Sequence, residues 1–328
     1  MSHQQKPLGS GFTAASTADD VAAGIDLKGR NIIVTGGHAG IGLETTRALA
    51  KAGASVTLAA RDPQRAAQAV TGVPRVEVSQ LDLIDPQSID AFVARWLASK
   101  RPLHVLINNA SPVPSATRES DARGYEVQFA GSHLGHFQLT VGLETALRAA
   151  GGARVINVSS GAQRFGQIRW DDPSFSRDYD SRVAYAQAKK ANVLFAVELD
   201  RRWASHGIRA YAVHPGVVVG TTLNSSSGPA ALREMGLIDG DGNPIIDPQR
   251  GKKTVPQGAS TTVFAATSPL LADVGGVYLL DNDVSRIDDE PRTLSASERV
   301  PAEVHSSSID PDAARRLWEL SERLLGMR

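Results

Sequence analysis

Tyr185 and Lys189 lie four residues apart in the segment YAQAK, a spacing that places both side chains on one face of a helix. A tyrosine phenol, with an ordinary pKa of about 10, is a poor acid or base near neutral pH. A lysine ammonium beside the phenol favours the phenolate and lowers that pKa. Such a tyrosine can protonate the oxygen of a carbonyl group during reduction, or deprotonate an alcohol in the reverse direction. We therefore predict that Tyr185 is an acid–base group and that Lys189 lowers the pKa of its phenol.

Two adjacent serines, Ser159 and Ser160, follow the apolar run ARVINV and offer a hydroxyl that could orient the same oxygen. Ser159 should still alternate within the strand, so Ser160 is the better candidate. A serine pair after a strand also suits ordinary turn chemistry, and the sequence leaves that alternative open.

A glycine-rich turn, TGGHAGIG, joins an apolar run at 31–35 to a helix expected from Gly40 to Lys51. Glycines at such a junction let the backbone turn tightly and approach a pyrophosphate, and the helix N-terminus offers unpaired N–H groups. An ordinary turn would also contain glycines. Because this one opens the first strand–helix unit of the chain, it predicts a dinucleotide site.

The end of the second expected strand indicates which dinucleotide binds. An acidic residue there would accept the ribose hydroxyls of NAD and repel a 2′-phosphate, but the position is Ala60. The next residue, Arg61, suits a phosphate. Asp62 precedes Pro63 and is expected to cap a helix. The sequence therefore favours NADP(H) over NAD(H), with a solvated surface charge as the alternative role of Arg61.

These residues are positioned by strands and helices that alternate along the chain. We expect strands at 31–35, 55–60, 75–81, 103–108, 153–159, 208–214 and 276–280. Helices near 40–51, 86–99, 121–149 and 182–206 separate them. This alternation predicts an α/β fold with a doubly wound parallel sheet, whose ligand lies at the carboxyl ends of the strands.

Composition excludes several function classes. The 328 residues carry 35 basic and 35 acidic side chains, and a net charge near zero argues against binding nucleic acid or an anionic membrane. The absence of cysteine excludes disulfides, thiol nucleophiles and cysteine-bound zinc. The polar N-terminus has no signal-peptide core, and no apolar run is long enough for a membrane anchor. We expect a cytoplasmic protein with an N-terminal arm (1–27) and a single domain (28–328) that contains a substrate loop at about 222–255.

Five segments together resemble the short-chain dehydrogenase/reductase family over nearly the whole chain. They are TGxxxGIG at Thr35–Gly42, NNAS at Asn108–Ser111, INVSS, YxxxK at Tyr185–Lys189 and HPG at His214–Gly216. HLGHF and KANVLFAVEL are most similar to the retinol dehydrogenase and WW-domain-containing oxidoreductase group. The resemblance implies one Rossmann-type domain with a seven-stranded parallel sheet. It also implies a homodimer or homotetramer formed through the helices at 121–149 and 182–206.

The resemblance also implies a role for each matching residue. At the pyrophosphate and ribose end the implied residues are Gly36, His38, Gly40, Ile41, Gly42 and Arg61. The residues implied beside the adenine and along the inner wall of the cofactor site are Asp82, Leu83, Asn109 and Ala110. At the nicotinamide and its ribose they are Pro215, Val218, Tyr185 and Lys189. Ser160 would orient the carbonyl.

Three positions depart from the family pattern. Ser111 stands where glycine is usual, and the threonine that contacts the cofactor comes one place late, at Thr221. In FAGSHLGHF, Ser132 replaces the asparagine that completes the four-residue catalytic set by holding a relay water. The neighbouring His133 and His136 belong to the family pattern. They have no further ligands at metal-binding spacing, so packed or hydrogen-bonded helix histidines are the better interpretation.

These residues predict an NADP(H)-dependent oxidoreductase that acts on a hydrophobic ketone, aldehyde or alcohol. The apolar residues that suggest a substrate pocket are Phe165, Trp170, Tyr179, Met235, Leu237, Ile245 and Ile246. Ordinary core packing is the alternative role for that set. Ser132 also leaves open a cofactor-binding protein with weakened catalysis, and the fold alone would allow an epimerase or a C=C reductase.

Overall fold

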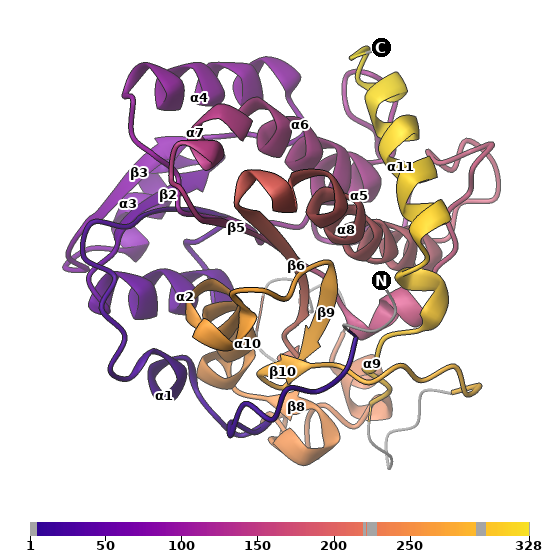
Figure 1. The fold of residues 1–328 in the computed structure, drawn as a ribbon. Coiled ribbons are helices and arrows are strands. Elements are labelled where there is room, and N and C mark those ends of the chain that lie inside the picture. The colour runs from indigo at the N-terminus through magenta and orange to yellow at the C-terminus, as the bar shows by residue number, and fades with distance from the viewer. Residues whose placement is uncertain (1–4, 219–220, 222–227, 293–299, 328) are drawn as a thin grey trace.

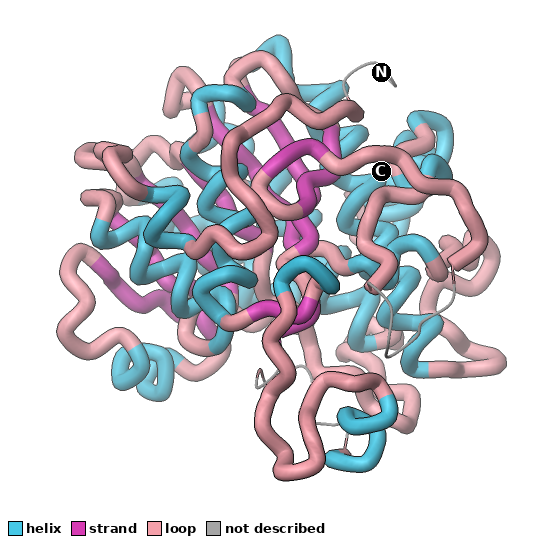
Figure 2. Tube along the Cα trace, turned by 90° about the horizontal axis from the view of Figure 1, so that it is seen from below, coloured by secondary structure: helices cyan, strands magenta, loops and turns pink. Residues whose placement is uncertain are grey.

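The computed structural model describes residues 5–218, 221, 228–292 and 300–327. These residues form one eight-stranded sheet with helices on both faces (Figures 1 and 2). In spatial order its strands are β10 (Asp283–Val284), β9 (Val277–Leu280), β6 (Ile208–His214), β5 (Ala153–Val158), β4 (Val105–Asn108), β1 (Asn31–Thr35), β2 (Ser55–Ala60) and β3 (Val76–Gln80). Two short strands, β7 (Val217–Val218) and β8 (Lys252–Lys253), pair outside this sheet.

The predicted α/β fold is confirmed, and the seven expected strands are parallel neighbours. The strand count is corrected from seven to eight because β10 returns antiparallel to β9. Asp281 and Asn282 form the two-residue turn between them, and both have positive φ, 52° and 66°. Such turns favour Asn and Asp because the left-handed conformation costs these residues little. The added strand is therefore a local hairpin at the sheet edge.

Eleven α-helices cover the sheet within the described residues. They are α1 (Ala18–Ala22), α2 (Gly40–Lys51), α3 (Pro63–Ala69), α4 (Pro86–Ala98), α5 (Val127–Phe129), α6 (Gly135–Gly142), α7 (Glu144–Arg148), α8 (Ser181–Trp203), α9 (Pro229–Glu234), α10 (Val255–Thr267) and α11 (Pro311–Leu324). Helices α2 and α10 pack on one face of the sheet, with α1 against them, and α4, α6 and α8 pack on the other (Figure 1). The carboxyl ends of β1, β4, β5 and β6 therefore meet along one edge.

Aspartate side chains begin several of these helices. Asp62 accepts hydrogen bonds from the backbone N–H groups of Gln64 and Arg65, both at 3.1 Å, which confirms its predicted role as a cap. Asp180 accepts from the N–H groups of Arg182 (2.8 Å) and Val183 (3.1 Å) at the start of α8. Each such cap contributes about 1 kcal/mol to helix stability. A capped α8 holds Tyr185 in its first turns.

The helix expected at 121–149 is broken into shorter pieces. It begins at Val127, contains one π-helical turn at Ala130–Leu134 and breaks again at Leu143 before α7. Gly135 follows the π-helical turn and lies against the backbone of Leu83, where a Cβ atom would collide with the Leu83 carbonyl. Single π-helical turns inside α-helices are frequent at functional sites. Ser132 lies in the middle of this one.

The C-terminal helix α11 runs along α8 (Figure 1). The ring centre of Trp318 lies 4.8 Å from that of Phe137, 5.9 Å from that of Phe195 and 6.1 Å from that of Trp203. Helices α6 and α8 are those through which the sequence predicts a homo-oligomer. Here they bury part of their surface against α11 of the same chain.

The N-terminal arm is also packed on the domain. The Gln5 side chain donates from Nε2 to the carbonyl oxygens of Tyr278 (2.9 Å) and Ser285 (2.8 Å). Its Oε1 accepts from the N–H of Tyr278 at 2.9 Å. The glutamine side chain therefore pairs with the β9 backbone. Among the described residues, no helix has the length and apolar character required to cross a membrane.

Candidate active site

Tyr185 and Lys189 share one face of α8, as their spacing predicts. The Lys189 ammonium nitrogen lies 5.4 Å from the centre of the Tyr185 ring. It also lies 3.5 Å from the carbonyl oxygen of Val158, the last residue of β5. Burial lowers the pKa of the Lys189 ammonium to about 8. The lysine is therefore still mostly protonated at pH 7.

Ser160 lies beside Tyr185 at the carboxyl end of β5. Burial raises the pKa of the Tyr185 phenol, and its hydrogen bond with the Ser160 hydroxyl opposes that rise. The net shift is upward, opposite to the lowering that the sequence predicts from Lys189, because burial outweighs the other effects. The Ser160 Oγ also accepts from the N–H of Ala162 at 3.2 Å, so the serine both caps a 3₁₀ turn and faces the tyrosine. The Ser159 hydroxyl donates instead to the Lys189 carbonyl at 2.6 Å. Of the two serines, only Ser160 lies where it can share a ligand with Tyr185.

His214, which the sequence marks only as part of HPG, holds the turn that follows Ser160. Its Nδ1 accepts from the N–H of Gly161 at 3.1 Å. The imidazole is 3% exposed at the end of β6, the strand beside β5. In the sequence, the position of this histidine at the carboxyl end of a central strand could have identified it as a site residue. We assign it as a positioning residue for the serine turn.

His136 connects the π-helical turn to the ends of β1 and β4. Its Nδ1 lies 3.0 Å from the Ser132 carbonyl oxygen, which can only accept, so Nδ1 carries the proton. Its Nε2 then accepts from the Thr35 hydroxyl at 2.9 Å. The Thr35 oxygen accepts in turn from the N–H groups of Asn109 (2.9 Å) and Ala110 (3.0 Å). Burial lowers the pKa of His136 to about 4, so the ring is neutral at pH 7.

His133 packs in an aromatic cluster and ties α11 to the π-helical turn. Its ring centre lies 5.2 Å from that of Phe129 and 5.7 Å from that of Phe195. Its Nε2 lies 2.8 Å from the Ser321 hydroxyl, which itself donates to the Leu317 carbonyl. Burial lowers the pKa of His133 to about 3. These contacts agree with the interpretation of packed, hydrogen-bonded histidines.

Two of the departures from the family pattern lie in contact with each other. The hydroxyl oxygens of Ser111 and Ser132 are 3.0 Å apart. Ser132 is fully buried, whereas Ser111 follows β4 and is partly exposed. The serine pair therefore joins the π-helical turn to the loop after β4. These two departures from the family pattern look unrelated in the sequence, and only the fold shows that they are neighbours.

The glycine-rich turn packs closely against the residues that follow β4. Gly36 and Gly40 have positive φ, 65° and 51°. A Cβ atom on Gly36 would lie 3.0 Å from the Cβ of Ala110, and one on Gly42 would collide with the Asn109 side chain and the Gly36 carbonyl. The Asn109 amide donates to the Thr35 carbonyl at 2.8 Å and holds this arrangement. The turn leads into the 12-residue helix α2, whose N-terminus favours an anion.

Basic side chains gather where β2 ends. Burial lowers the pKa of His38, as do the nearby guanidinium groups of Arg65 and Arg61, while Asp62 opposes the effect. The buried His38 Nδ1 has no hydrogen-bond partner among the described residues. Arg61 is exposed at the strand end. Arg65, in the first turn of α3, was not predicted from the sequence.

The remaining predicted cofactor residues follow the carboxyl ends of β3 and β6. The Asp82 carboxylate accepts from the N–H of Ile84 at 3.1 Å. The Thr221 hydroxyl donates to the Val218 carbonyl at 3.2 Å, and a Cβ atom on Gly40 would lie 3.3 Å from the Thr221 methyl. Thr221 therefore lies beside the glycine-rich turn. Leu83, Ile41 and Pro215 lie partly buried along the same edge.

The two expected substrate segments are only partly buried. Phe165, Met235 and Ile246 are 46%, 45% and 43% exposed, whereas Leu237 is 5% exposed. Residues 222–227 of the expected substrate loop lie outside the described part of the chain. The described part of the loop therefore combines two packed apolar residues, Leu237 and Ile238, with the exposed Met235 and Ile246.

Comparison with known proteins agrees with this geometry. The short chain dehydrogenase family profile matches residues 30–231. A "Probable oxidoreductase" of Streptomyces lividans is 43% identical over 90% of this chain and 97% of its own length. Retinol dehydrogenase 12 of Homo sapiens is 35% identical over 93% of this chain and 89% of its own length.

Among solved structures, an uncharacterized protein from Mycobacterium Paratuberculosis superposes with a TM-score of 0.68 and 31% identity. The superposition covers 92% of this chain and 96% of that one. The predicted family is confirmed, and retinol dehydrogenases are among the relatives that this chain resembles. The chain belongs to the short chain dehydrogenase family.

Proposed function

We propose that this chain is an NADP(H)-dependent oxidoreductase that interconverts a carbonyl group and an alcohol. The observation that carries the proposal is the set formed by Tyr185, Ser160 and Lys189 at the carboxyl edge of the sheet. The ring of Tyr185 faces the lysine at 5.4 Å and its phenol contacts the serine. The glycine-rich turn opens at the end of β1, two strands from β5 in the same sheet.

The residues present fit a dinucleotide, because glycines stand where a Cβ atom would fill the turn. When bound, NADP(H) donates or accepts the hydride. Gly36, Gly40 and Gly42 would hold the pyrophosphate, while Arg61, assisted by Arg65 and His38, would hold the 2′-phosphate. Asp82, Leu83, Asn109, Ala110, Pro215, Val218 and Thr221 would line the rest of the cleft.

In this proposal Tyr185 moves the proton. Its phenol donates to the carbonyl oxygen during reduction and takes the proton back during oxidation. The Ser160 hydroxyl orients that oxygen by a hydrogen bond. We expect the positive charge of the Lys189 ammonium to oppose the rise in the phenol pKa that burial causes.

The substrate that we propose is a hydrophobic ketone, aldehyde or alcohol. The retinol dehydrogenase relatives, which are named for an apolar alcohol, support this class without selecting a compound. The partly exposed apolar residues Phe165, Met235 and Ile246 supply surface for such a molecule.

A panel of carbonyl and alcohol compounds, assayed with NADPH and NADP⁺, tests the proposal. Tyr185→Phe removes the proton donor and keeps the ring, and we expect turnover to fall about 10²- to 10⁴-fold. Tyr125→Phe is the matched control, because that hydroxyl only bonds to the Leu324 carbonyl at 2.7 Å. Equal rates in Tyr185→Phe and the unaltered protein would contradict the mechanism.

A second candidate is a cofactor-binding protein with weakened catalysis. The contact between Ser132 and Ser111 favours it, because a serine pair offers different donors and a shorter reach than an amide. The same panel separates the candidates: NADPH binding without turnover indicates this one. Product formed without a net change in NADP(H) would indicate epimerisation, and C=C reduction would indicate a double-bond reductase.

The homodimer or homotetramer and the cytoplasmic location remain predictions. Because α11 covers part of α6 and α8, an oligomer would have to use other parts of these helices or another face. Light scattering on the purified chain measures the mass directly. A monomeric mass would contradict the prediction of a homo-oligomer.

A further inference from the structure

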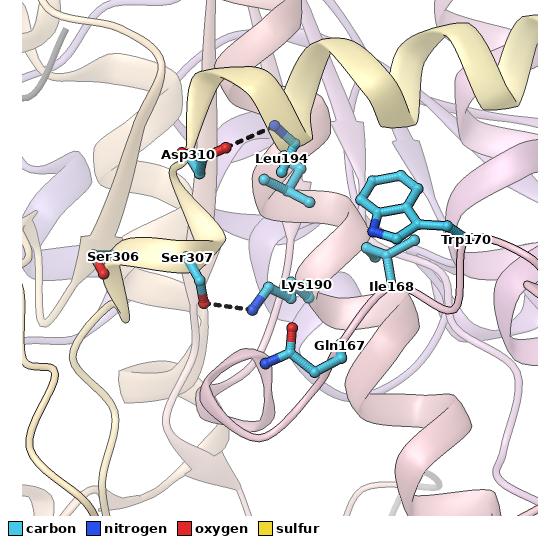
Figure 3. A pocket seen from close by; sticks show the side chains of 9 residues that line it. Gln167, Ile168, Trp170, Lys190, Leu194, Ser306, Ser307 and Asp310 are labelled. Carbon is cyan, nitrogen blue, oxygen red and sulfur yellow. Dashed lines mark hydrogen bonds between the residues drawn. The ribbon is translucent and has the colours of Figure 1, made fainter.

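A pocket of about 400 Å³ lies between α8, the segment after the serine turn, and the start of α11 (Figure 3). Lys190 stands in its middle. The Ser306 and Ser307 hydroxyls lie to one side of the lysine, and Trp170 and Ile168 lie to the other. Trp170 also belongs to the set of apolar residues that suggest a substrate pocket, whereas the other residues named here have no predicted role in the active site. We call this cavity the Lys190 pocket.

The charge of Lys190 is poorly compensated. The residue is 2% exposed, and its ammonium donates to the Ser307 hydroxyl at 2.6 Å. Its hydrogen-bond partner within the described part of the chain is therefore a neutral group. Burial lowers the pKa of Lys190 to about 8, so the group is mostly charged at pH 7. A buried ammonium with one neutral partner is costly, and an anion that enters the pocket would relieve that cost.

The pocket's other groups define what kind of anion fits. Ser306 and Gln167 add neutral hydrogen-bond donors, while Trp170, Ile168 and Leu194 supply apolar surface. Asp310 lies at the rim, where its carboxylate accepts from the N–H of Ala313 at 2.7 Å. That negative charge disfavours a doubly charged group such as phosphate. We propose that the Lys190 pocket binds a small organic carboxylate, with the carboxylate on Lys190 and the apolar body against Trp170 and Ile168.

The Lys190 pocket is separate from the proposed chemistry, although Lys190 directly follows Lys189. The Lys189 ammonium lies at the Tyr185 ring and the Val158 carbonyl. The Lys190 ammonium lies at Ser307, more than a hundred residues further along the chain. Adjacent lysines on one helix therefore serve two different sites, and binding at the second does not depend on the proposed activity.

The test is a titration of the full chain, saturated with NADPH, with 2-naphthoate and with its neutral analogue 2-naphthamide, which is outside the proposed substrate class. Calorimetry measures both affinities. We expect 2-naphthoate to bind about 10-fold or more tightly than the neutral analogue, since a hydrogen-bonded charge pair contributes that much. Lys190→Met should remove this preference and leave the affinity for the amide unchanged. Lys28→Met, at an exposed lysine, is the matched control and should bind as the unaltered chain does.

Equal affinity of Lys190→Met and the unaltered chain for 2-naphthoate would overturn the proposal. Equal affinities of the unaltered chain for the acid and the amide would overturn it as well. If 2-naphthoate did not bind to the unaltered chain, the proposal would also be overturned. The comparison of the two ligands uses only the unaltered chain, so it can overturn the proposal even if Lys190→Met fails to fold.

Discussion

Two buried histidines should make this protein lose stability on acidification. Burial lowers the pKa of His133 to about 3 and that of His136 to about 4, from an ordinary value of 6.5. Below pH 6.5 the unfolded chain therefore takes up protons that the folded chain does not. The stability that these histidines contribute is complete above pH 6.5 and is lost as the pH falls below it.

The size of the effect follows from the two pKa values of each histidine. Between pH 7.5 and pH 5.0, protonation of one unfolded histidine lowers the free energy of unfolding by about 2 kcal/mol. Both rings remain neutral in the folded chain at pH 5.0, so the pair accounts for about 4 kcal/mol. That loss is a large part of the roughly 5–15 kcal/mol that holds a typical domain folded.

Urea denaturation at pH 7.5 and pH 5.0 measures the effect. His133→Phe keeps an aromatic ring among Phe129, Phe137 and Phe195 and removes the titrating group. The loss between the two pH values should shrink by about 2 kcal/mol in this variant. His206→Gln, at an exposed histidine, is the control and should keep the full loss. A loss in His133→Phe equal to that of the unaltered protein would refute the reasoning.

Three further changes test other parts of the structure. Arg61→Ala should lower the preference for NADPH over NADH about 10-fold or more, because it removes a charged phosphate contact. The preference is measured as the ratio of the two kcat/KM values. An unchanged ratio would mean that Arg61 is only a surface charge. Ser132→Asn should raise the reductase rate if the proton relay is impaired, and an unchanged rate would mean that the pair with Ser111 already compensates. Trp318→Ala should lower the free energy of unfolding by about 3–5 kcal/mol in urea, because it empties the space between α11 and α8; a loss below 1 kcal/mol, the scale of a surface substitution, would show that α11 adds little stability.

The sequence by itself determined the parts of this protein that depend on local pattern. The alternation of apolar runs predicted the seven parallel strands and therefore the edge at which the site lies. The spacing of Tyr185 and Lys189 predicted their shared helix face, and Pro63 predicted that Asp62 caps a helix. These features involve residues within a few positions of each other, so helix geometry and backbone preferences are sufficient to predict them.

The tertiary structure decided everything that joins distant segments. It placed Ser111 beside Ser132 and Thr35 beside His136. The serine and the second histidine of FAGSHLGHF therefore contact the ends of β4 and β1. It also placed Lys190 beside Ser307 in a pocket of its own. No local pattern encodes such pairs, because they depend on how the sheet orders its strands and how α11 folds back over α8. Burial then set the pKa values, since only the packed chain removes these histidines and lysines from water.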